Sequence, residues 1–577
     1  MTVRFAISPA YCRRMTGMIA SAAFSLTLFG CGVAHVTGTQ PATPLTCSQL
    51  AGVTVPASAI GLPTSGARVT AAATVAASGV GGSRTPEYCK VLGSIKPVDP
   101  AAPPIDFEID MPTNWNKKVM MFGGGGYDGA IPATAVNVPA GPLDQPTPLG
   151  RGYAVFASDS GHQSASKLNI EDGSFGVNDE ALRNFSGDAL KKTRDAAIFL
   201  IDARYAVNQP DRAYFAGGSS GGREALAVVQ RWPQDWDGSI VLYPAWNAAS
   251  LDLQFGRITR AFAAPGAYLN PAKRKTLYDA VMATCDGLDG VKDGIISNVA
   301  ACNAKFNPRK AKWHGKPLRC RGGADTGDTC LSDAQIAALN VYDTPVTFAY
   351  PLASGETQYP GFNVYGADLG MAGTTLEQAR MRLLTMGASQ PAHPMPADAP
   401  FLSVFWDQWI RYFVTRDPGY DSLTVDPQRP GPLQARISEL TALQDVNKTD
   451  LSAFAAKGGK LLIAHGTSDV VVSTRATEQY FDRLQTTMGV AKVRAFARYY
   501  EIPGYGHAVG TAFNAAWDSL TTLENWVEKG VAPPPQIVAD SYGVPGRTRP
   551  LCEYPAWPRY TGSGDVDAAS SFACVLR

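Results

Sequence analysis

The chain carries little charge for its length and almost no excess of either sign. Only 18% of its 577 residues are charged, and the formal net charge is +1. This balance excludes the strongly basic surface with which proteins bind nucleic acid or an anionic membrane. We therefore expect no nucleic-acid partner, and no membrane contact through surface charge.

Histidines and long hydrophobic runs are scarce as well. The chain has six histidines, and none lies next to a cysteine in the sequence, which argues against a cysteine nucleophile or a zinc cluster. The apolar stretch Met18 to Gly30 is too short to span a bilayer. Because it follows Arg4, Arg13 and Arg14, it predicts a secretory signal peptide over residues 1–30.

The end of this leader leaves two forms of export open. Leu28-Phe29-Gly30-Cys31 resembles a lipobox, in which Cys31 would be lipidated and anchored to a membrane. Ordinary cleavage nearby would instead release a soluble protein. Residues 31–46, rich in Thr, Pro, Ala and Gly, predict a flexible tether. We expect an exported protein: an outer-membrane lipoprotein, or a periplasmic or secreted protein.

The remaining cysteines predict a disulfide framework. Cys12 leaves with the signal peptide, and setting Cys31 aside leaves an even set of eight. In an exported chain such a set indicates four disulfides. The sequence alone leaves the pairing open, but the spacing favours local pairs: Cys47–Cys89, Cys285–Cys302, Cys320–Cys330 and Cys552–Cys574.

Short apolar runs that end in Gly or Asp alternate with helical patterns. This alternation predicts an α/β fold with a mostly parallel sheet. Residues 246–450 break the rhythm, and we interpret them as an inserted lid domain over the strand ends. The α/β domain would then comprise residues 47–245 and 451–577. The expected strands are Val119–Phe122, Tyr153–Ala157, Ala213–Ala216, Ile240–Tyr243, Leu461–Ala464 and Val493–Tyr500.

Gly217-Gly218-Ser219-Ser220-Gly221-Gly222 follows one of these apolar runs and precedes a helical segment. Strand, G-x-S-x-G and helix together form the pattern of a nucleophile elbow, which exposes a serine hydroxyl on a tight turn. A second register would centre the motif on Ser220. We favour Ser219, because this register leaves the spare glycine at the start of the helix.

A serine nucleophile needs a base and an acid, and both follow in the order that α/β-hydrolases use. Asp469 lies in His465-Gly466-Thr467-Ser468-Asp469, directly after an apolar strand. His507 is the only histidine beyond it. Alone, each could be an ordinary loop residue. Together with the elbow, they predict a triad of Ser219, Asp469 and His507 in an α/β-hydrolase fold.

A glycine-rich segment, Gly123 to Gly126, ends an early strand. Enzymes of this kind place an oxyanion-stabilising N–H there. We therefore assign the oxyanion donors to Gly123 and to the backbone N–H of Ser220. A phosphate-binding loop is the alternative for such glycines, but no Lys-Ser or Lys-Thr pair follows here.

Cys285 to Ile295 forms an acidic, glycine-rich loop that holds Asp286, Asp289 and Asp293. Hard oxygen ligands on a bending loop suit Ca²⁺, although the spacing is not that of an EF-hand. A solvated acidic turn is the alternative, and the spacing alone does not decide between them.

These motifs resemble the tannase/feruloyl esterase family. The resemblance covers the elbow with Gly221-Gly222-Arg223-Glu224, the acidic loop, the His-Gly-x-Ser-Asp segment and two C-terminal segments that begin at Arg547 and Tyr560. It implies an α/β-hydrolase with a large lid that carries a structural Ca²⁺. The implied ligands are the side chains of Asp286, Asp289 and Asp293 and the carbonyls of Val291 and Ile295.

The chain departs from this family beside the nucleophile and the histidine. Two cysteines that are usually joined there are replaced by Gly218 and Ala508. If the fold is the family's, restoring them should form a disulfide without large backbone movement. The lid arginine that binds a carboxylate in terephthalate-monoester hydrolysis has no clear counterpart in Met395–Phe405.

The expected function is a serine carboxylic ester hydrolase that acts on small aromatic esters of the feruloyl or galloyl type. A terephthalate-monoester hydrolase and a general short-chain esterase are alternatives, and a non-catalytic surface ligand-binding protein is the alternative from another class. The candidate substrate-binding residues are Phe405, Trp406, Trp409 and Val472, although any single lid aromatic could be simple lid core.

Overall fold

The structure is a computed structural model that describes residues 43–164 and 170–576. The expected leader (residues 1–30), the candidate lipidation site Cys31 and most of the expected tether lie outside the described residues. The chain from Pro41 to Arg577 forms one compact unit. The functional residues predicted from the sequence all belong to this unit.

A ten-stranded mixed sheet runs through the unit in the order β1-β2-β3-β4-β6-β5-β7-β8-β13-β14. Neighbouring strands are antiparallel from β1 to β6 and parallel from β6 to β14. The parallel half is the sheet expected for an α/β-hydrolase, and the antiparallel half was not predicted. The strands are β1 Thr54–Val55, β2 Ala67–Val75, β3 Tyr88–Ile95, β4 Ile105–Pro112, β5 Lys118–Phe122, β6 Ala154–Ser158, β7 Arg212–Gly218, β8 Gly238–Leu242, β13 Lys460–Gly466 and β14 Ala497–Ile502.

The parallel strands are apolar on both faces, and successive side chains enter two different cores. In β5, Val119 and Met121 join the core that contains helices α2, α3 and α12, whereas Met120 and Phe122 join the core that contains α14. This two-residue alternation follows from the pleat of a strand. Helices on both faces therefore keep the parallel strands dry, as a parallel sheet requires.

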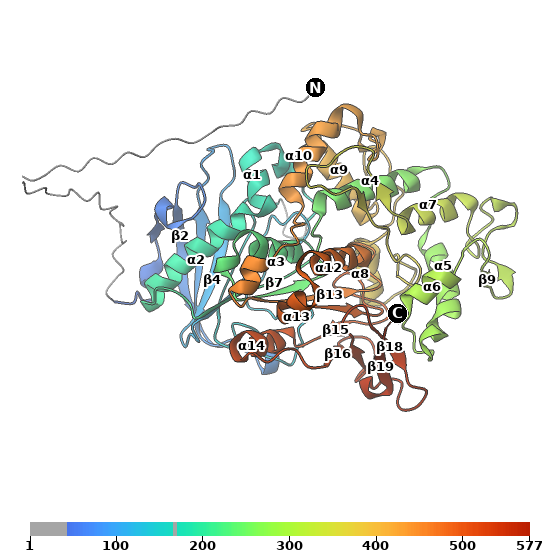
Figure 1. Ribbon diagram of the computed structural model, residues 1–577. Helices are drawn as coiled ribbons and strands as arrows, with labels where there is room; N and C mark the ends of the chain where they lie inside the picture. Colours follow the sequence, from blue (N-terminus) through green and yellow to red (C-terminus); the bar gives the residue numbers. More distant parts are fainter. Residues whose placement is uncertain (1–42, 165–169, 577) are drawn as a thin grey trace, which may run out of the picture. The chain divides into compact units, whose positions relative to one another are not determined.

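The helices of the α/β part connect these strands (Figure 1). They are α1 Asp179–Arg183, α2 Ala189–Tyr205, α3 Ser220–Arg231, α11 Ser452–Ala456, α12 Thr474–Met488, α13 Val490–Phe496 and α14 Ser519–Lys529. The strand expected over Val493–Tyr500 is wrong in its first half. Those residues finish α13, and β14 begins only at Ala497.

Strands β8 and β13 are neighbours in the sheet, yet more than 200 residues separate them in the sequence. We call residues 246–450 between them the insert. Figure 1 shows its helices α4, α9 and α10 above the sheet and α5, α6 and α7 to one side. Its helices are α4 Ala248–Ala263, α5 Pro271–Cys285, α6 Val299–Lys305, α7 Asp333–Asp343, α8 Leu376–Leu384, α9 Phe401–Gln408 and α10 Gln434–Gln444.

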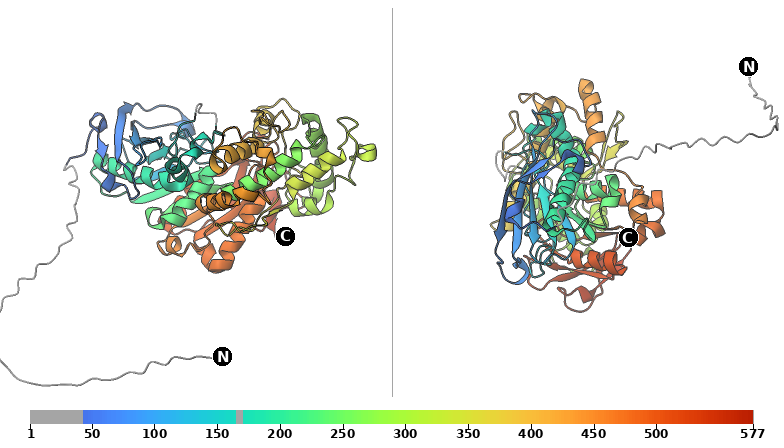
Figure 2. Two further views of the ribbon diagram at one scale, coloured as in Figure 1. Left: turned by 90° about the horizontal axis from the view of Figure 1, so that it is seen from above. Right: turned by 90° about the vertical axis from the view of Figure 1, so that its left-hand side faces the viewer.

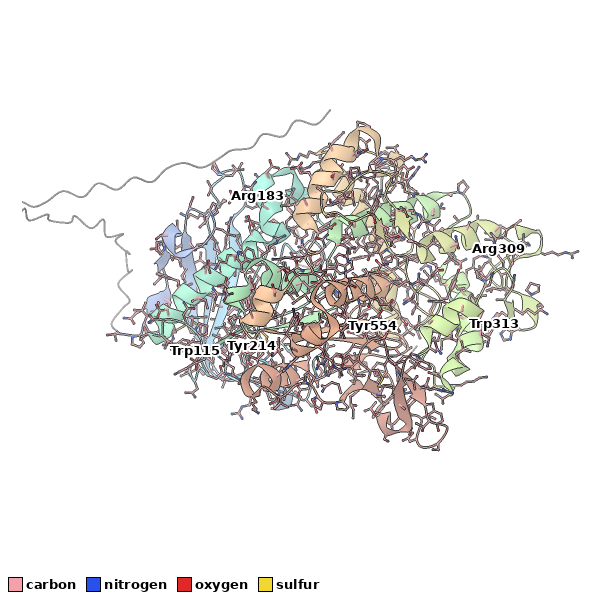
Figure 3. The ribbon with its side chains drawn as sticks, in the orientation of Figure 1. Trp115, Arg183, Tyr214, Arg309, Trp313 and Tyr554 are labelled. Atoms are coloured by element: carbon pink, nitrogen blue, oxygen red, sulfur yellow. A yellow bond between two sulfur atoms is a disulfide. The ribbon has the colours of Figure 1, made fainter. Side chains whose placement is uncertain are left out.

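Figure 2 shows the yellow-green part of the insert and the blue antiparallel strands at opposite ends of this unit, with the orange helices of the insert between them. Figure 3 places Arg309 and Trp313 of the insert far from Tyr214 of the sheet. Two short strand pairs belong to the insert: β9 Lys312–Trp313 with β10 Lys316–Pro317, and β11 Val346–Thr347 with β12 Gln358–Tyr359. The insert therefore builds a layer of its own, largely from helices, on the parallel side of the sheet.

Disulfides tie several of these segments together. The structure has the four expected pairs: Cys47–Cys89, Cys285–Cys302, Cys320–Cys330 and Cys552–Cys574. Cys552–Cys574 joins the C-terminal strands β15 Ala515–Ala516, β16 Gln536–Asp540, β17 Thr548–Leu551, β18 Trp557–Tyr560 and β19 Phe572–Val575 into one region. This framework fits an oxidising compartment outside the cytoplasm. Across residues 43–164 and 170–576, no helix has the length and apolarity needed to cross a membrane.

Candidate active site

Ser219 occupies the turn between the end of β7 and the start of α3. Its backbone is left-handed, with φ 61° and ψ −124°, a conformation that costs energy in any residue except glycine. The turn lifts the hydroxyl away from the sheet. Ser219 therefore has the strained backbone of a nucleophile elbow.

The glycines around Ser219 are required by close backbone contacts. A Cβ on Gly217 would lie 2.2 Å from the carbonyl oxygen of Gly221, and one on Gly221 would lie 2.7 Å from that of Gly124. Ser220, in contrast, is the first residue of α3, and its hydroxyl donates to the carbonyl of Gly126 at 2.6 Å. The geometry therefore favours the register centred on Ser219.

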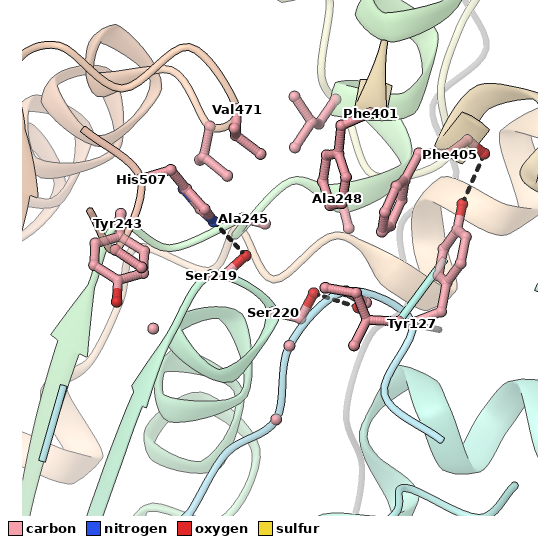
Figure 4. A pocket seen from close by; sticks show the side chains of 18 of the residues that line it. Tyr127, Ser219, Ser220, Tyr243, Ala245, Ala248, Phe401, Phe405, Val471 and His507 are labelled. Carbon is pink, nitrogen blue, oxygen red and sulfur yellow. Dashed lines mark hydrogen bonds between the residues drawn. The ribbon is translucent and has the colours of Figure 1, made fainter. Parts of the chain in front are cut away.

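The structure brings the three predicted triad residues together, and Figure 4 shows His507 facing the hydroxyl of Ser219. The Ser219 hydroxyl lies 2.9 Å from Nε2 of His507, and Nδ1 of His507 lies 2.7 Å from Oδ2 of Asp469. Since a carboxylate only accepts, Nδ1 must carry a proton and Nε2 must accept from the serine. Ser219, His507 and Asp469 thus form one continuous chain of hydrogen bonds, the arrangement that a catalytic triad requires.

Asp469 is fully buried and has several donors. Burial acts to raise its pKa, but the neighbouring His507 and the hydrogen bonds from His507 and His465 outweigh burial and hold the pKa well below its ordinary value. Its second oxygen accepts the N–H groups of Val471 and Val472 at 2.8 and 2.9 Å. The carboxylate is therefore kept ionised and fixed in orientation.

His465 is a further residue of this site, and sequence reasoning did not assign it a role. It is fully buried, and its Nε2–H faces both Oδ2 of Asp469 and the carbonyl of Val472, at 3.2 and 3.1 Å. Its Nδ1 accepts from the hydroxyl of Thr477 at 2.8 Å. The signal was present in the sequence, because His465 opens the same short segment that ends with Asp469.

The assignment of Gly123 as an oxyanion donor is wrong. Its N–H donates to the carbonyl of Ala216 at 3.0 Å, because the β5–β7 pairing continues to this residue. The next N–H, on Gly124, donates to Oε2 of Glu224. The N–H groups of Gly125, Gly126 and Ser220 have no acceptor within the described part of the chain, and all three residues line the pocket at Ser219.

A buried acidic pair supports this glycine loop from behind. Burial raises the pKa of Glu224, and burial together with the adjacent Glu224 raises the pKa of Asp128 well above its ordinary value. Burial therefore favours the protonated form of these carboxyls, and both oxygens of Asp128 are without a hydrogen-bond partner among the described residues. Glu224 can then hold the N–H of Gly124 without leaving two buried negative charges side by side.

A pocket with a cavity volume of about 330 Å³ opens in front of Ser219 and His507. Phe405 and Val472 line it, as expected, together with Phe401, which sequence reasoning missed. Figure 4 shows Phe401 and Phe405 on the insert side of the nucleophile. The hydroxyl of Tyr127 donates to the carbonyl of Phe405 at 3.1 Å and fixes that wall to the α/β part.

The assignments of Trp406 and Trp409 to substrate binding are wrong. Both side chains are fully buried and lie outside the pocket lining. The ring of Trp406 packs where α4 has only Gly256, whose Cβ would lie 2.6 Å from that ring. Helix α9 presents Phe401 and Phe405 to the pocket, whereas Trp406 and Trp409, the latter just after α9, lie in the core of the insert.

The space of the missing cysteine pair is occupied by Tyr243. A Cβ on Gly218 would lie 2.5 Å from the Tyr243 ring, and the same ring packs 4.8 Å from the His507 imidazole. A cysteine at 218 would therefore collide with this ring. Formation of a disulfide between positions 218 and 508 therefore requires this ring to move, and the expectation stays a prediction.

In the acidic loop expected to bind Ca²⁺, one carboxylate oxygen lacks a partner and another carboxylate is already paired. The Oδ2 atom of Asp289 is buried without a hydrogen-bond partner, and burial together with the charge of Asp293 raises the pKa of Asp289 to about 6. Asp293, however, forms an ion pair with Arg549. No group of three or more acidic, His or Cys side chains arranged to hold a metal occurs among the residues that the structure describes. The orphaned oxygen is thus the only feature here that fits a cation.

The chain is similar to known esterases over most of its length. A family model described as tannase and feruloyl esterase matches residues 89–575. An uncharacterised esterase of Agrobacterium fabrum is 38% identical over 538 residues, which cover 92% of this chain and 93% of the relative.

Two further similar proteins carry more specific names. Mono(2-hydroxyethyl) terephthalate hydrolase of Piscinibacter sakaiensis is 31% identical, with 85% of each chain covered. The crystal structure of feruloyl esterase B from Aspergillus oryzae matches with a TM-score of 0.70 at 22% identity and covers 92% of this chain and 99% of the other. The latter likeness establishes a shared fold.

Proposed function

This chain belongs to the tannase and feruloyl esterase family of ester hydrolases, and on that premise we propose that it cleaves small aromatic carboxylic esters with Ser219 as its nucleophile. The observation that carries the proposal is the hydrogen-bonded chain from Ser219 through His507 to Asp469. Ser219 and His507 line a pocket whose size suits a single aromatic ring.

The reaction begins with attack of the Ser219 hydroxyl on the ester carbonyl. His507 takes the hydroxyl proton on Nε2 and returns it to the departing alcohol, which leaves an acyl group on the serine. A water molecule then attacks the acyl group in the same way, with His507 as the base, and the carboxylic acid leaves Ser219. Asp469 holds the imidazole in the reactive tautomer and stabilises its protonated form, while His465 positions Asp469 from the other side.

The developing oxyanion needs donors that have no other acceptor. We assign this role to the N–H of Ser220 together with the N–H groups of the Gly125–Gly126 segment. Ser220 lies at the N-terminus of α3, where the helix dipole adds partial positive charge. The side chain of Ser220 is bonded to Gly126 and plays no part in the proton transfer.

Feruloyl- or galloyl-type acyl groups fit the apolar walls that Phe401 and Phe405 provide. The relationship to the terephthalate-monoester hydrolase supports a second candidate substrate class. Turnover of feruloyl, galloyl, terephthaloyl-monoester and short-chain p-nitrophenyl esters separates these functions from a general esterase. Absence of both turnover and labelling by a fluorophosphonate would contradict the proposal and support a non-catalytic binding protein.

Two further features belong to this proposal. We propose that Asp286, Asp289 and Asp293, with the carbonyls of Val291 and Ile295, hold a structural Ca²⁺, and the unpartnered oxygen of Asp289 supports this. We also propose export, with an outer-membrane anchor at Cys31 if that residue is lipidated. Mass spectrometry of the mature N-terminus distinguishes a lipidated Cys31 from a freely released chain.

A further inference from the structure

The active-site pocket contains a buried acid that the ester-cleavage mechanism does not use. Asp252 lies on α4, is 5% exposed and lines the same cavity as Ser219. Its carboxyl makes no hydrogen bond and no ion pair to any residue in the described part of the chain. A buried carboxyl without partners is costly, so its place in a ligand-sized cavity points to a ligand.

Gln444, at the end of α10, lines the same cavity. The indole N–H of Trp409 donates to its Oε1 at 3.0 Å, which fixes the orientation of the amide. Nε2 of Gln444 therefore carries both hydrogens, and it has no acceptor among the described residues. The next residue, Asp445, accepts the N–H of Ala249 and the hydroxyl of Ser250, which attaches the end of α10 to the start of α4.

The surroundings of Asp252 favour the protonated form of its carboxyl. Burial, and then the nearby charge of Asp445, raise its pKa well above the ordinary value, while Arg223 lowers it without offsetting burial. Arg223 itself is held elsewhere, since it donates to the carbonyl of Phe185 and packs 4.6 Å from that ring. A protonated carboxyl can both donate and accept a hydrogen bond.

We propose that Asp252 and Gln444 form a hydroxyl-binding subsite in the acyl pocket, which selects aromatic acyl groups that carry a ring hydroxyl. This inference rests on the proposed function. The oxygen of a phenolic hydroxyl would accept a hydrogen bond from Nε2 of Gln444. Its O–H would donate to the carboxyl of Asp252. The neighbouring walls, formed by Leu251, Phe255 and Phe401, are apolar and hold the ring. A substrate carboxylate in the same place would lose its hydration, and no Lys or Arg among the described lining residues would balance its charge.

The test compares esters that differ only at the ring. The substrates are methyl cinnamate and its 3-hydroxy, 4-hydroxy and 4-carboxy derivatives, and the measured quantity is the ratio of kcat/KM for each derivative to that for methyl cinnamate. We expect the better hydroxylated ester to be preferred by about tenfold or more, since one hydrogen bond to a buried polar group is at stake. The carboxylated ester should fall below methyl cinnamate.

The variants assign this preference to the two residues. Asp252→Leu should bring the ratio for the hydroxylated ester close to one, whereas Asp252→Asn, which keeps a hydrogen-bonding group, should retain part of it. Gln444→Met should also reduce the ratio. The matched control is Asp407→Asn, a buried carboxyl on α9 that is bonded to Arg411 and Ser422 outside the pocket, and the wild-type ratio should persist there.

Failure of this inference is distinguishable from failure of the proposed function. A wild-type enzyme that reacts with fluorophosphonate and cleaves p-nitrophenyl acetate, but shows a ratio of one, overturns the hydroxyl subsite and leaves the esterase intact. Asp252→Asn and Asp252→Leu could instead lower kcat/KM equally on the hydroxylated ester and on methyl cinnamate. Asp252 would then have only a structural role, and the hydroxyl subsite would also be overturned. Absence of labelling and of all turnover contradicts the proposed function, and the subsite with it.

Discussion

The two sides of the active-site pocket differ in how completely their polar side chains are satisfied. On the sheet side, Ser219, His507 and Asp469 are linked to one another, and Asp469 also accepts from backbone N–H groups. On the insert side, Asp252 and Nε2 of Gln444 face the cavity without partners among the described residues. The sheet side is preorganised for chemistry before a substrate arrives, whereas the insert side has hydrogen bonds still to make.

This difference predicts two kinds of mutational effect. Changes on the sheet side should lower kcat, because they disturb groups that act in the transition state. Changes on the insert side should alter the choice of substrate or the stability of the insert. The predictions below test this division, from the largest expected effect to the smallest.

Replacing the nucleophile should have the largest effect. We expect Ser219→Ala to lower kcat by about 10⁶-fold, judged from other serine triads. Ser220→Ala should keep most of the activity, because Ser220 contributes its backbone N–H and its hydroxyl is bonded to Gly126. Steady-state kinetics on p-nitrophenyl acetate measure both. If Ser220→Ala were the inactive variant, the register of the elbow would be wrong.

Replacing the buried acid should have the next largest effect. Asp469→Asn removes the charge and favours the wrong tautomer of His507, so kcat should fall by about 10⁴-fold. His465→Gln should cost much less, because it affects Asp469 only indirectly. Single-turnover kinetics with fluorophosphonate labelling measure this step. A variant Asp469→Asn with more than a tenth of wild-type activity would contradict the role of Asp469.

The aromatic residues of α9 should divide between stability and binding. Trp406→Ala leaves a cavity beside Gly256 and should cost about 3–5 kcal/mol in the free energy of unfolding. Phe401→Ala opens the pocket and should raise KM for aromatic esters by about two- to tenfold. Denaturant titrations and kinetics separate the two. A Trp406→Ala enzyme of unchanged stability with a raised KM would reverse this division.

The sequence predicted the sheet side well, because local backbone constraints determine it. The elbow needs glycines at fixed positions around Ser219, and Asp469 and His507 must follow strands in a set order. Gly123 was assigned wrongly for a related reason. The sequence shows where the strand β5 stops only approximately, and its pairing with β7 takes up the N–H of Gly123.

The sequence predicted the insert side poorly, because tertiary packing determines which face of each helix meets the pocket. Phe401, Phe405, Trp406 and Trp409 all lie on one aromatic-rich segment, and nothing in the segment distinguishes the pocket face from the core face. The distinction comes from Gly256 on α4, more than 140 residues away in the sequence, which leaves room for Trp406. Asp252 and Gln444 were missed because neither belongs to a recognisable motif.

Removal of calcium tests whether a bound Ca²⁺ contributes to the stability of the insert. If the acidic loop binds Ca²⁺, the native state should gain about 2.7 kcal/mol at a hundredfold excess of calcium over Kd. A strong chelator should then lower Tm in the wild-type protein and have no further effect in Asp289→Asn. Asp279→Asn, a partly exposed residue of α5 paired with Lys275, is the matched control and should keep the response. An unchanged Tm, together with the absence of calcium by elemental analysis, would contradict the proposed calcium site.

Variants around Tyr243 test whether its ring holds His507 in place where a disulfide is missing. In Gly218→Cys with Ala508→Cys, the new side chain at 218 meets the Tyr243 ring, so we expect no disulfide and a loss of about 1–3 kcal/mol in stability from overpacking. Adding Tyr243→Gly removes the ring and relieves the positive φ of 35° at that position, and thiol titration should then show a disulfide. Ala508→Cys alone is the control and should fold normally.

A disulfide that formed in the double variant with full activity would mean that the ring moves aside readily and does not support His507. A triple variant with the disulfide but slow turnover would mean that contact between Tyr243 and His507 matters for catalysis itself.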